Sequence, residues 1–232
     1  MYRFDVAIIS FFNAFAHRSF AFDSAVGLLS NSNLLKGVVI MALLWWVWFR
    51  PDRDNTRNRQ ILLTTLLAGA LAVGVARGLA LTLPFRPRPL QEPALHFVVP
   101  YTMLPIDMEA WSSFPSDHAA LFFALATGLV LVSKPIGSLG LFYVFTFICL
   151  PRIYLGLHYP TDIIAGTLIG ISITGVLCAP RIRAALTLPL LNWLEKHPSS
   201  FYAAFFLVSY EISTLFNGVR TFARIAFPLL KR

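Results

Sequence analysis

The chain has 232 residues, of which 57% are hydrophobic and 13% are charged, and its mean hydropathy is +0.69. This composition argues against a soluble globular domain and favours a protein embedded in lipid. The net charge of +8 would suggest nucleic-acid binding in a soluble chain, but many of the basic residues stand in short loops beside apolar segments, where membrane topology accounts for them. We expect one membrane-embedded domain, 1–232, that binds no nucleic acid.

Residues 1–30 mix aromatic and aliphatic side chains with polar and charged ones, which predicts an interfacial helix rather than a span. No cleaved signal peptide is expected, because Asp5 interrupts the start and no clear cleavage site follows. Residues 34–49 are apolar and end in a tryptophan-rich group, so they predict the first span. The loop 50–60 carries four arginines, which places it on the cytoplasmic side.

Five further apolar segments follow: 61–83, 119–132, 138–150, 163–178 and 201–216. The last contains Glu211 and is followed by charged residues, so it either spans or lies along the surface. A second basic stretch, 181–196, is also predicted to be cytoplasmic, which is consistent with the assignment of the loop 50–60. The sequence therefore predicts an all-α, polytopic membrane helical bundle of five or six transmembrane helices with an N-terminal interfacial helix.

This alternation brings three polar segments to the non-cytoplasmic face, and the first of them, 77–89, is rich in arginine. Arg86 and Arg88 are separated by one proline, so two guanidinium groups can be held near each other before a ligand binds. Guanidinium groups bind phosphate through paired hydrogen bonds. Arg77 lies about two turns inside the preceding helix and can point into a cavity. The alternative is that these arginines only anchor the chain to lipid head groups.

The second polar segment reads Phe-Pro-Ser-Asp-His at 114–118 and predicts the start of a helix. Pro115 suits the first turn, and Ser116 and Asp117 can cap the exposed backbone amides. A helix N-terminus attracts phosphate, and His118 in that turn can donate a proton to a leaving oxygen. The alternative is an ordinary helix start.

The third polar segment places Arg152, His158 and Asp162 within eleven residues. If a helix begins near Tyr159 or Pro160, Asp162 lies one turn after His158. Its carboxylate can then hold the imidazole in one tautomer and leave the other nitrogen free to attack phosphorus. The alternative is a capped helix with a simple His–Asp hydrogen bond.

No metal or other cofactor is expected. A metal site would need a further ligand, and His96 stands in a loop that nothing fixes near the other histidine residues. Cys149 and Cys178 lie inside apolar segments without metal-binding spacing, so we expect buried thiols.

Together, the three segments resemble the type 2 phosphatidic acid phosphatase superfamily, whose motifs are KxxxxxxRP, PSGH and SRxxxxxHxxxD in that order. The third motif matches with its spacing intact, although Pro151 replaces the serine. The second has aspartate in place of glycine, a form that resembles the undecaprenyl diphosphate phosphatases of the superfamily. In the first, Arg88 and Pro89 match but Leu81 stands at the lysine position, and Arg77 or Arg86 is a candidate for the missing charge.

The resemblance covers about 60–175, the expected catalytic core, and it implies a role for each matched residue. His158 would form a phosphohistidine, Asp162 would orient it, and His118 would protonate the leaving group and later activate water. Arg88 and Arg152 would clamp the phosphate, joined by Ser116. Beyond the matched residues, we also expect phosphate binding by Arg86, Asp117 and Arg77.

The implied activity is metal-independent hydrolysis of the terminal phosphate of a lipid phosphate or diphosphate, with undecaprenyl diphosphate favoured. The site would face the periplasm or the cell exterior, in a protein of the bacterial inner membrane whose partners are its substrate and the membrane lipids. Alternative substrates are phosphatidylglycerol phosphate, phosphatidate and lipid A phosphate. A lipid phosphotransferase and a non-enzymatic lipid or anion transporter are the competing functions.

Overall fold

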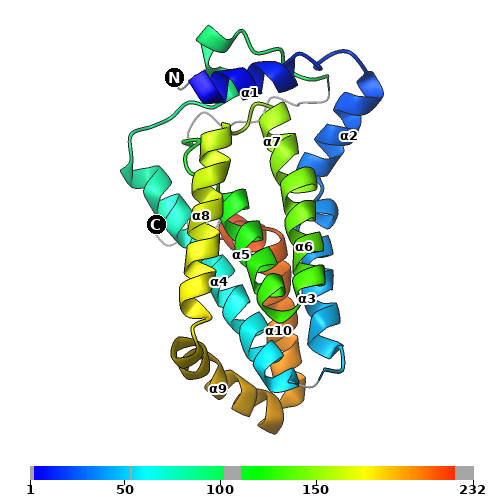
Figure 1. Cartoon of the computed structure of the whole chain (residues 1–232), viewed down its shortest axis with the longest axis vertical. Coiled ribbons are helices and arrows are strands. Elements are labelled where there is room, and N and C mark those ends of the chain that lie inside the picture. Colours follow the sequence, from blue (N-terminus) through cyan, green and yellow to red (C-terminus); the bar gives the residue numbers. More distant parts are fainter. Residues whose placement is uncertain (1–2, 53, 102–110, 223–232) are drawn as a thin grey trace.

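The computed structural model describes residues 3–52, 54–101 and 111–222, and every regular element in these ranges is helical, as the sequence predicts (Figure 1). The helices are α1 (Arg3–Asn13), α2 (Phe20–Asn31), α3 (Val39–Phe49), α4 (Asn55–Thr82), α5 (Asp117–Val132), α6 (Lys134–Tyr143), α7 (Leu150–Tyr154), α8 (Pro160–Leu177), α9 (Pro180–Lys196) and α10 (Pro198–Ser213). Two π-helical segments, η1 (Leu34–Val38) and η4 (Val144–Cys149), join α2 to α3 and α6 to α7, and two short 3₁₀ turns are η2 (Pro89–Gln91) and η3 (Pro93–Leu95).

Helix α5 forms the centre of the bundle and packs against α4, α6 and α8. Every side chain from Ala119 to Ala126 is buried, as expected for a helix that is apolar on all sides. Gly166 and Gly170 of α8 let its backbone approach α5 closely, because a Cβ atom at either position would lie 2.3 Å from a carbonyl oxygen of Ser116 or Ala120. This contact sets the start of α8 beside the start of α5.

Three helical stretches are long and apolar enough to cross a membrane: Asn55–Thr82, Lys134–Tyr154 and Pro160–Leu177. The pair Phe20–Asn31 and Leu34–Phe49, bent by 70°, makes a fourth if it is one span, and Asp117–Val132 is apolar but shorter. The chain is thus an all-helical integral membrane protein with three or four candidate spans by length and composition.

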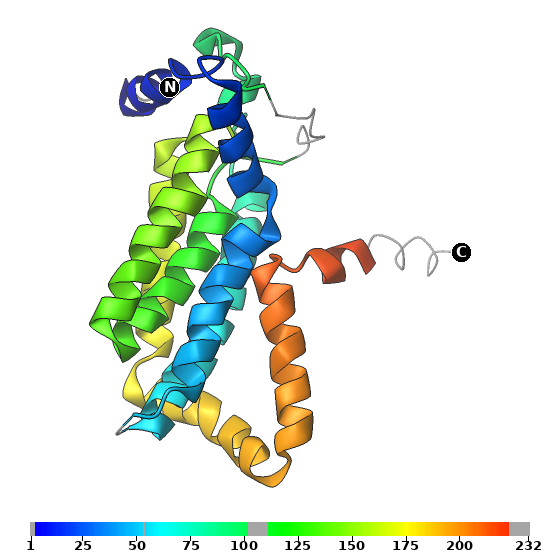
Figure 2. The same ribbon diagram turned by 90° about the vertical axis from the view of Figure 1, so that its right-hand side faces the viewer.

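The N-terminal region differs from the single interfacial helix predicted for 1–30. Helix α1 lies across one end of the bundle, whereas α2 turns down its side and leads into α3 (Figure 2). The polar residues that suggested a surface helix are partly satisfied inside the protein. The Asp23 side chain is buried and accepts hydrogen bonds from the Tyr154 hydroxyl and the Tyr101 backbone N–H.

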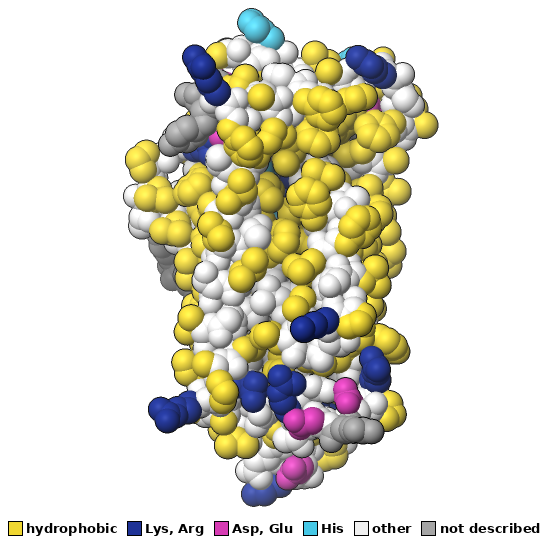
Figure 3. Space-filling model, viewed as in Figure 1, with side chains coloured by type: hydrophobic (Ala, Val, Ile, Leu, Met, Phe, Trp, Pro, Cys, Tyr) yellow, Lys and Arg dark blue, Asp and Glu magenta, His cyan; other side chains and the backbone are white. Residues whose placement is uncertain are grey.

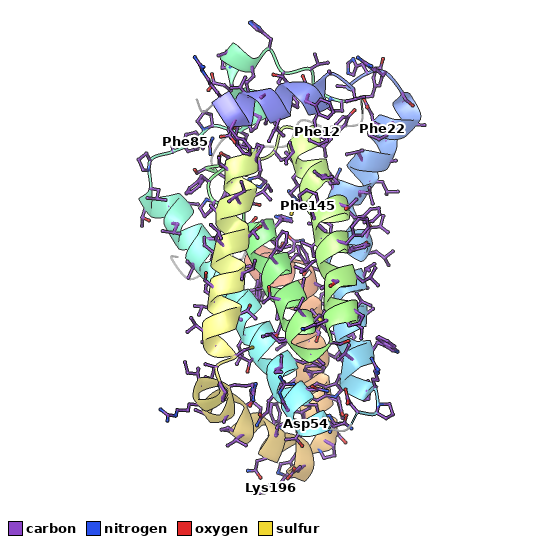
Figure 4. All side chains as sticks on the ribbon, viewed as in Figure 1. Phe12, Phe22, Asp54, Phe85, Phe145 and Lys196 are labelled. Carbon is purple, nitrogen blue, oxygen red and sulfur yellow. The ribbon has the colours of Figure 1, made fainter. Side chains whose placement is uncertain are left out.

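The two basic regions lie at one end of the molecule. Helix α9 crosses the end of the bundle opposite α1 (Figure 1), and lysine and arginine side chains gather near it while hydrophobic ones cover much of the middle (Figure 3). Asp54 and Lys196 mark this end, and Phe12, Phe22 and Phe85 mark the opposite one (Figure 4). The basic stretch 181–196 forms a helix, which was not predicted.

Helix α10 returns from the α9 end along α3 and α4. Aromatic contacts hold it there, since Trp48 lies 4.8 Å from Phe205 between ring centroids, and the Trp45 indole N–H donates to Ser209 over 3.1 Å. The segment 201–216 therefore runs lengthwise beside the bundle for most of its extent.

Candidate active site

A cavity of about 190 Å³ opens where the three predicted polar segments meet. Its walls come from α4, the loop before α5, α5, α7, the loop before α8 and the segment after α10. The lining residues are Ala76, Arg77, Ala80, Arg88, Trp111, Ser112, Pro115, Asp117, His118, Arg152, His158 and Arg220. The structure thus brings together one or more side chains from each segment.

His118 stands in the middle of a polar chain across this cavity. Its Nε2 atom accepts a hydrogen bond from the Arg152 guanidinium over 2.6 Å, and its Nδ1 lies 2.8 Å from Asp117 Oδ1. Because arginine can only donate, the imidazole proton must stand on Nδ1 and point at Asp117. Arg77 binds the other oxygen of Asp117 over 3.1 Å. The Asp117 carboxylate is therefore engaged by two neighbours, and its charge would repel a phosphate, so we assign it to positioning rather than to phosphate binding.

Arg88 and Arg152 are both buried and only partly hydrogen-bonded. Arg88 donates to the Leu157 carbonyl over 2.7 Å, and Arg152 donates to His118. The Nε atom of each is buried and has no hydrogen-bond partner among the described residues. A buried donor without an acceptor costs about 1–3 kcal/mol. Two such donors beside one cavity fit a ligand that is rich in acceptors, such as a phosphate.

The His158 side chain is 3% exposed and lines the same cavity. Its Nδ1 atom lies 2.9 Å from the carbonyl oxygen of Ser113, which can only accept, so Nδ1 carries the proton and Nε2 keeps its lone pair. Burial lowers the pKa of His158, and the charges of Arg88 and Arg152 lower it further while Asp162 opposes them. The ring is therefore neutral at neutral pH, as a nucleophile requires.

The partner that fixes His158 is not the predicted one. The nearest carboxylate oxygen of Asp162 lies 3.7 Å from Nδ1, beyond hydrogen-bond distance, and it accepts instead from the Tyr159 backbone N–H over 2.7 Å. The Ser113 carbonyl holds the imidazole, and Asp162 acts on it electrostatically. Every residue has a backbone carbonyl, so the sequence gives no signal that the one of Ser113 binds His158. Helix α8 does begin at Pro160, as predicted.

Arg86 belongs to a separate network behind His158. Its guanidinium donates to Asp162 over 2.5 Å, to Asp5 over 2.7 Å and to the Thr161 hydroxyl over 2.9 Å. It also lies 4.1 Å above the centre of the Tyr159 ring. Because two fully buried carboxylates already engage this guanidinium and it does not line the cavity, we correct the predicted phosphate-binding role of Arg86 to a structural one.

Ser116 is likewise engaged within the protein. It is fully buried, its hydroxyl caps α5 by accepting from the Ala119 N–H over 3.4 Å, and its own N–H donates to the Asp162 carbonyl over 3.1 Å. The backbone N–H is therefore engaged, whereas the hydroxyl keeps its own hydrogen as a donor, and Ser116 is not among the residues that line the cavity. The predicted capping is present, and the contact of Ser116 with phosphate stays a prediction.

Sequence reasoning missed several charged residues around the site. Asp5 and Lys36 each stand in an apolar segment, and an ionisable residue there is costly enough to signal a function. Lys36 is buried in η1, within electrostatic reach of Arg152, Asp117 and His118. Arg220 comes from a segment to which no role was given.

The residues considered for metal binding do not gather in the described part of the chain. No group of three or more His, Cys, Asp or Glu side chains there is arranged to hold a metal ion. His96 does not line the cavity. Cys149 and Cys178 are buried free thiols, as predicted.

Comparison with known proteins gives three relatives. The chain is 25% identical over 159 residues to undecaprenyl-diphosphatase BcrC of Bacillus subtilis, which covers 68% of this chain and 74% of that protein. It is 27% identical over 179 residues to putative undecaprenyl-diphosphatase YbjG of Escherichia coli, covering 75% and 83%. It is 40% identical over 77 residues to bacitracin transport permease protein BcrC of Bacillus licheniformis, covering 31% of this chain and 37% of that one.

No solved structure matches the chain. The model of the PAP2 superfamily matches residues 61–182, which include all three polar segments and more than half of the chain. This protein therefore belongs to the PAP2 superfamily.

Proposed function

We propose that the protein is a membrane lipid phosphatase that removes the terminal phosphate of a lipid diphosphate, with undecaprenyl diphosphate as the favoured substrate. One observation carries the proposal: the neutral His158 ring lines a cavity beside two buried guanidinium groups, each with an unpartnered N–H. The names of two relatives support the choice of lipid.

In the first step, His158 Nε2 attacks the terminal phosphorus while the bond from phosphorus to the bridging oxygen breaks. Arg88 and Arg152 bind the phosphoryl oxygens and stabilise the charge that builds up in the transition state. As Arg152 turns to the phosphate, it releases Nε2 of His118. The freed Nε2 atom of His118 takes up a proton from water in the cavity. His118, still held by Asp117, then donates this proton to the departing lipid monophosphate.

In the second step, His118 Nε2 accepts a proton from water as the water oxygen attacks the phosphohistidine. The nitrogen–phosphorus bond breaks, inorganic phosphate leaves and His158 returns to its neutral form. The Ser113 carbonyl keeps the His158 ring in one tautomer throughout. Arg77, which lines the cavity, supplies the positive charge that the motif lysine would give. The arginines of the site provide the electrostatic stabilisation, so we propose no metal-dependent step.

The proposed setting is one domain, 1–232, with its catalytic core at about 60–175 and five or six spans. The spans are α2–α3, α4, α5, α6–α7 and α8, with α10 as the sixth. The end that carries α9 and the basic loop would be cytoplasmic, by the positive-inside rule. The cavity would then face the periplasm or the cell exterior, with α1 at the interface and the lipid tail in the bilayer.

Phosphate release by the purified protein in detergent tests this function. The panel is undecaprenyl diphosphate, phosphatidylglycerol phosphate, phosphatidate and lipid A phosphate, each with and without a chelator. We expect undecaprenyl diphosphate to release inorganic phosphate without a second lipid, at a rate that the chelator does not change. A requirement for a second lipid would indicate phosphotransfer, and chelator sensitivity would contradict the metal-independent mechanism.

A further inference from the structure

The cavity has one arginine that comes from outside the matched family region. Arg220 lines the same cavity as Arg88, Arg152 and His158, although the family match ends at residue 182. Helix α10 carries the chain back from the α9 end, and the segment after it turns away at the depth of the bundle's middle (Figure 2). Arg220 thus brings the C-terminal segment 214–222 to the cavity.

An unusual turn sets the course of this segment. Leu215 and Phe216 have φ values of +52° and +57°, a left-handed conformation that is costly for bulky side chains and persists only where the surroundings fix it. The Phe216 N–H donates to the Glu211 carbonyl over 2.6 Å, and the Glu211 carboxylate accepts from the Val219 N–H over 3.2 Å. The Leu215 side chain is buried. Strained backbone of this kind clusters at binding sites.

The turn also contacts the site itself. Arg77 donates to the Leu215 carbonyl over 3.5 Å and to Asp117 over 3.1 Å, so the C-terminal segment meets the cavity at its Arg77 side. Arg88 binds a different backbone group, the carbonyl of Leu157, which is the residue before His158. Four arginines, Arg77, Arg88, Arg152 and Arg220, line the cavity, and the positive charge of Arg77 is balanced by Asp117.

We propose that Arg220 binds the second phosphate group of a lipid diphosphate, the one that leaves with the lipid, and so makes the site prefer diphosphates to monophosphates. Arg88 and Arg152 hold the phosphoryl group that His158 attacks, and the group that remains on the lipid needs a cation of its own. A guanidinium group suits it, because it is always charged and binds phosphate oxygens in pairs. This inference rests on the proposed function.

The test compares Arg220→Gln with the wild type on farnesyl diphosphate and on farnesyl monophosphate in detergent. We expect kcat/KM for the diphosphate to fall about 10- to 100-fold, mainly through KM, because a charged hydrogen bond to one phosphate is lost. For the monophosphate we expect a change below about 3-fold, because that substrate lacks the group that Arg220 binds. If the monophosphate turns over too slowly, its inhibition constant is compared instead. Arg57→Gln, an exposed arginine at the α9 end of α4, is the matched control and should change neither substrate.

The outcomes separate this inference from the proposed function. Equal losses for both substrates, or no loss for either, would overturn the role of Arg220 while leaving the phosphatase intact. A wild-type protein that releases no phosphate from either lipid, or from undecaprenyl diphosphate, would refute the proposed function itself. If Arg220→Gln lowers the unfolding temperature, Arg220→Lys is measured as well. A preference for the diphosphate that is reduced but not abolished supports the role of Arg220. A preference equal to that of the wild type opposes it.

Discussion

Arg86 and Arg88 are two residues apart, yet their guanidinium groups have opposite surroundings. Arg86 meets two buried carboxylates and a hydroxyl, and together they form a network linking α1 to the start of α8. Arg88 lines the cavity, and its Nε has no partner among the described residues.

The difference separates structure from function in one short motif. A buried ion network whose members are paired holds elements together, and removing one member leaves the others uncompensated. A buried cation with unused donors contributes less to stability and is available to an anion. We therefore propose that Arg86 positions the loop that carries His158 and that Arg88 binds the phosphate.

The largest expected effect is at the nucleophile. We expect His158→Ala to lower kcat by at least about 10³-fold, because no other group replaces the attacking nitrogen. Phosphate release from a lipid diphosphate measures this, with the thermal unfolding temperature as the folding control. A transporter that uses the same cavity would keep its transport activity in this variant. Retained phosphatase turnover would contradict the role of His158 as the nucleophile.

Arg86 and Arg88 should differ most clearly in what their substitution changes. We expect Arg88→Gln to lower kcat/KM about 10²- to 10³-fold with little loss of stability, because a donor to the transition state is removed. We expect Arg86→Gln to lower the free energy of unfolding by about 3 kcal/mol, because Asp5 and Asp162 stay buried without their cation. Kinetics and chemical unfolding of both variants in detergent check this. The reverse pattern would show that the two networks have been assigned the wrong way round.

Asp162 lies near His158 and also binds Arg86, whereas Asp5 belongs only to the Arg86 network. For Asp162→Asn we expect kcat to fall about 10- to 100-fold with a modest change in KM, less than the roughly 10⁴-fold expected where a carboxylate alone fixes the tautomer, since the Ser113 carbonyl does so here. Asp5→Asn should mainly reduce stability, by about 1–3 kcal/mol. Unchanged turnover in Asp162→Asn would remove it from the catalytic account.

The smallest expected effect concerns pH. Because the pKa of His158 is lowered by burial, the ring should stay neutral as the pH falls through about 6.5, the ordinary value for histidine. The acidic limb of kcat/KM should therefore have its midpoint below that pH, once the separately titrated ionisation of the lipid phosphate is taken into account. A midpoint above 6.5 would mean that the attacking group is not a buried neutral imidazole.

Much of the bundle could be predicted from the sequence because hydrophobic length and loop charge constrain it strongly. The apolar segments 119–132 and 163–178 correspond to α5 and α8 within a few residues at each end. The alternation of spans also predicted that the three polar segments would meet. Helix α2 was harder, because its polar Asp23 is satisfied by partners distant in sequence.

The details of the site depend on side-chain direction, which spacing does not encode. The proline-flanked arginines looked equivalent, and only their contacts separate Arg86 from Arg88. Asp5 reaches Thr161 across 156 residues, and Arg220 reaches the cavity through a turn of bulky residues that sequence patterns disfavour. Such long-range contacts leave no local signal.

The central claim is that His158 takes the phosphoryl group from the lipid, and labelling stopped with alkali tests it most directly. Wild-type protein mixed with lipid diphosphate labelled in the terminal phosphate, then denatured in alkali to preserve phosphohistidine, should carry label on the peptide that contains His158. The His158→Gln variant should carry none. Label on another residue, or steady turnover without any labelled protein, would contradict the account.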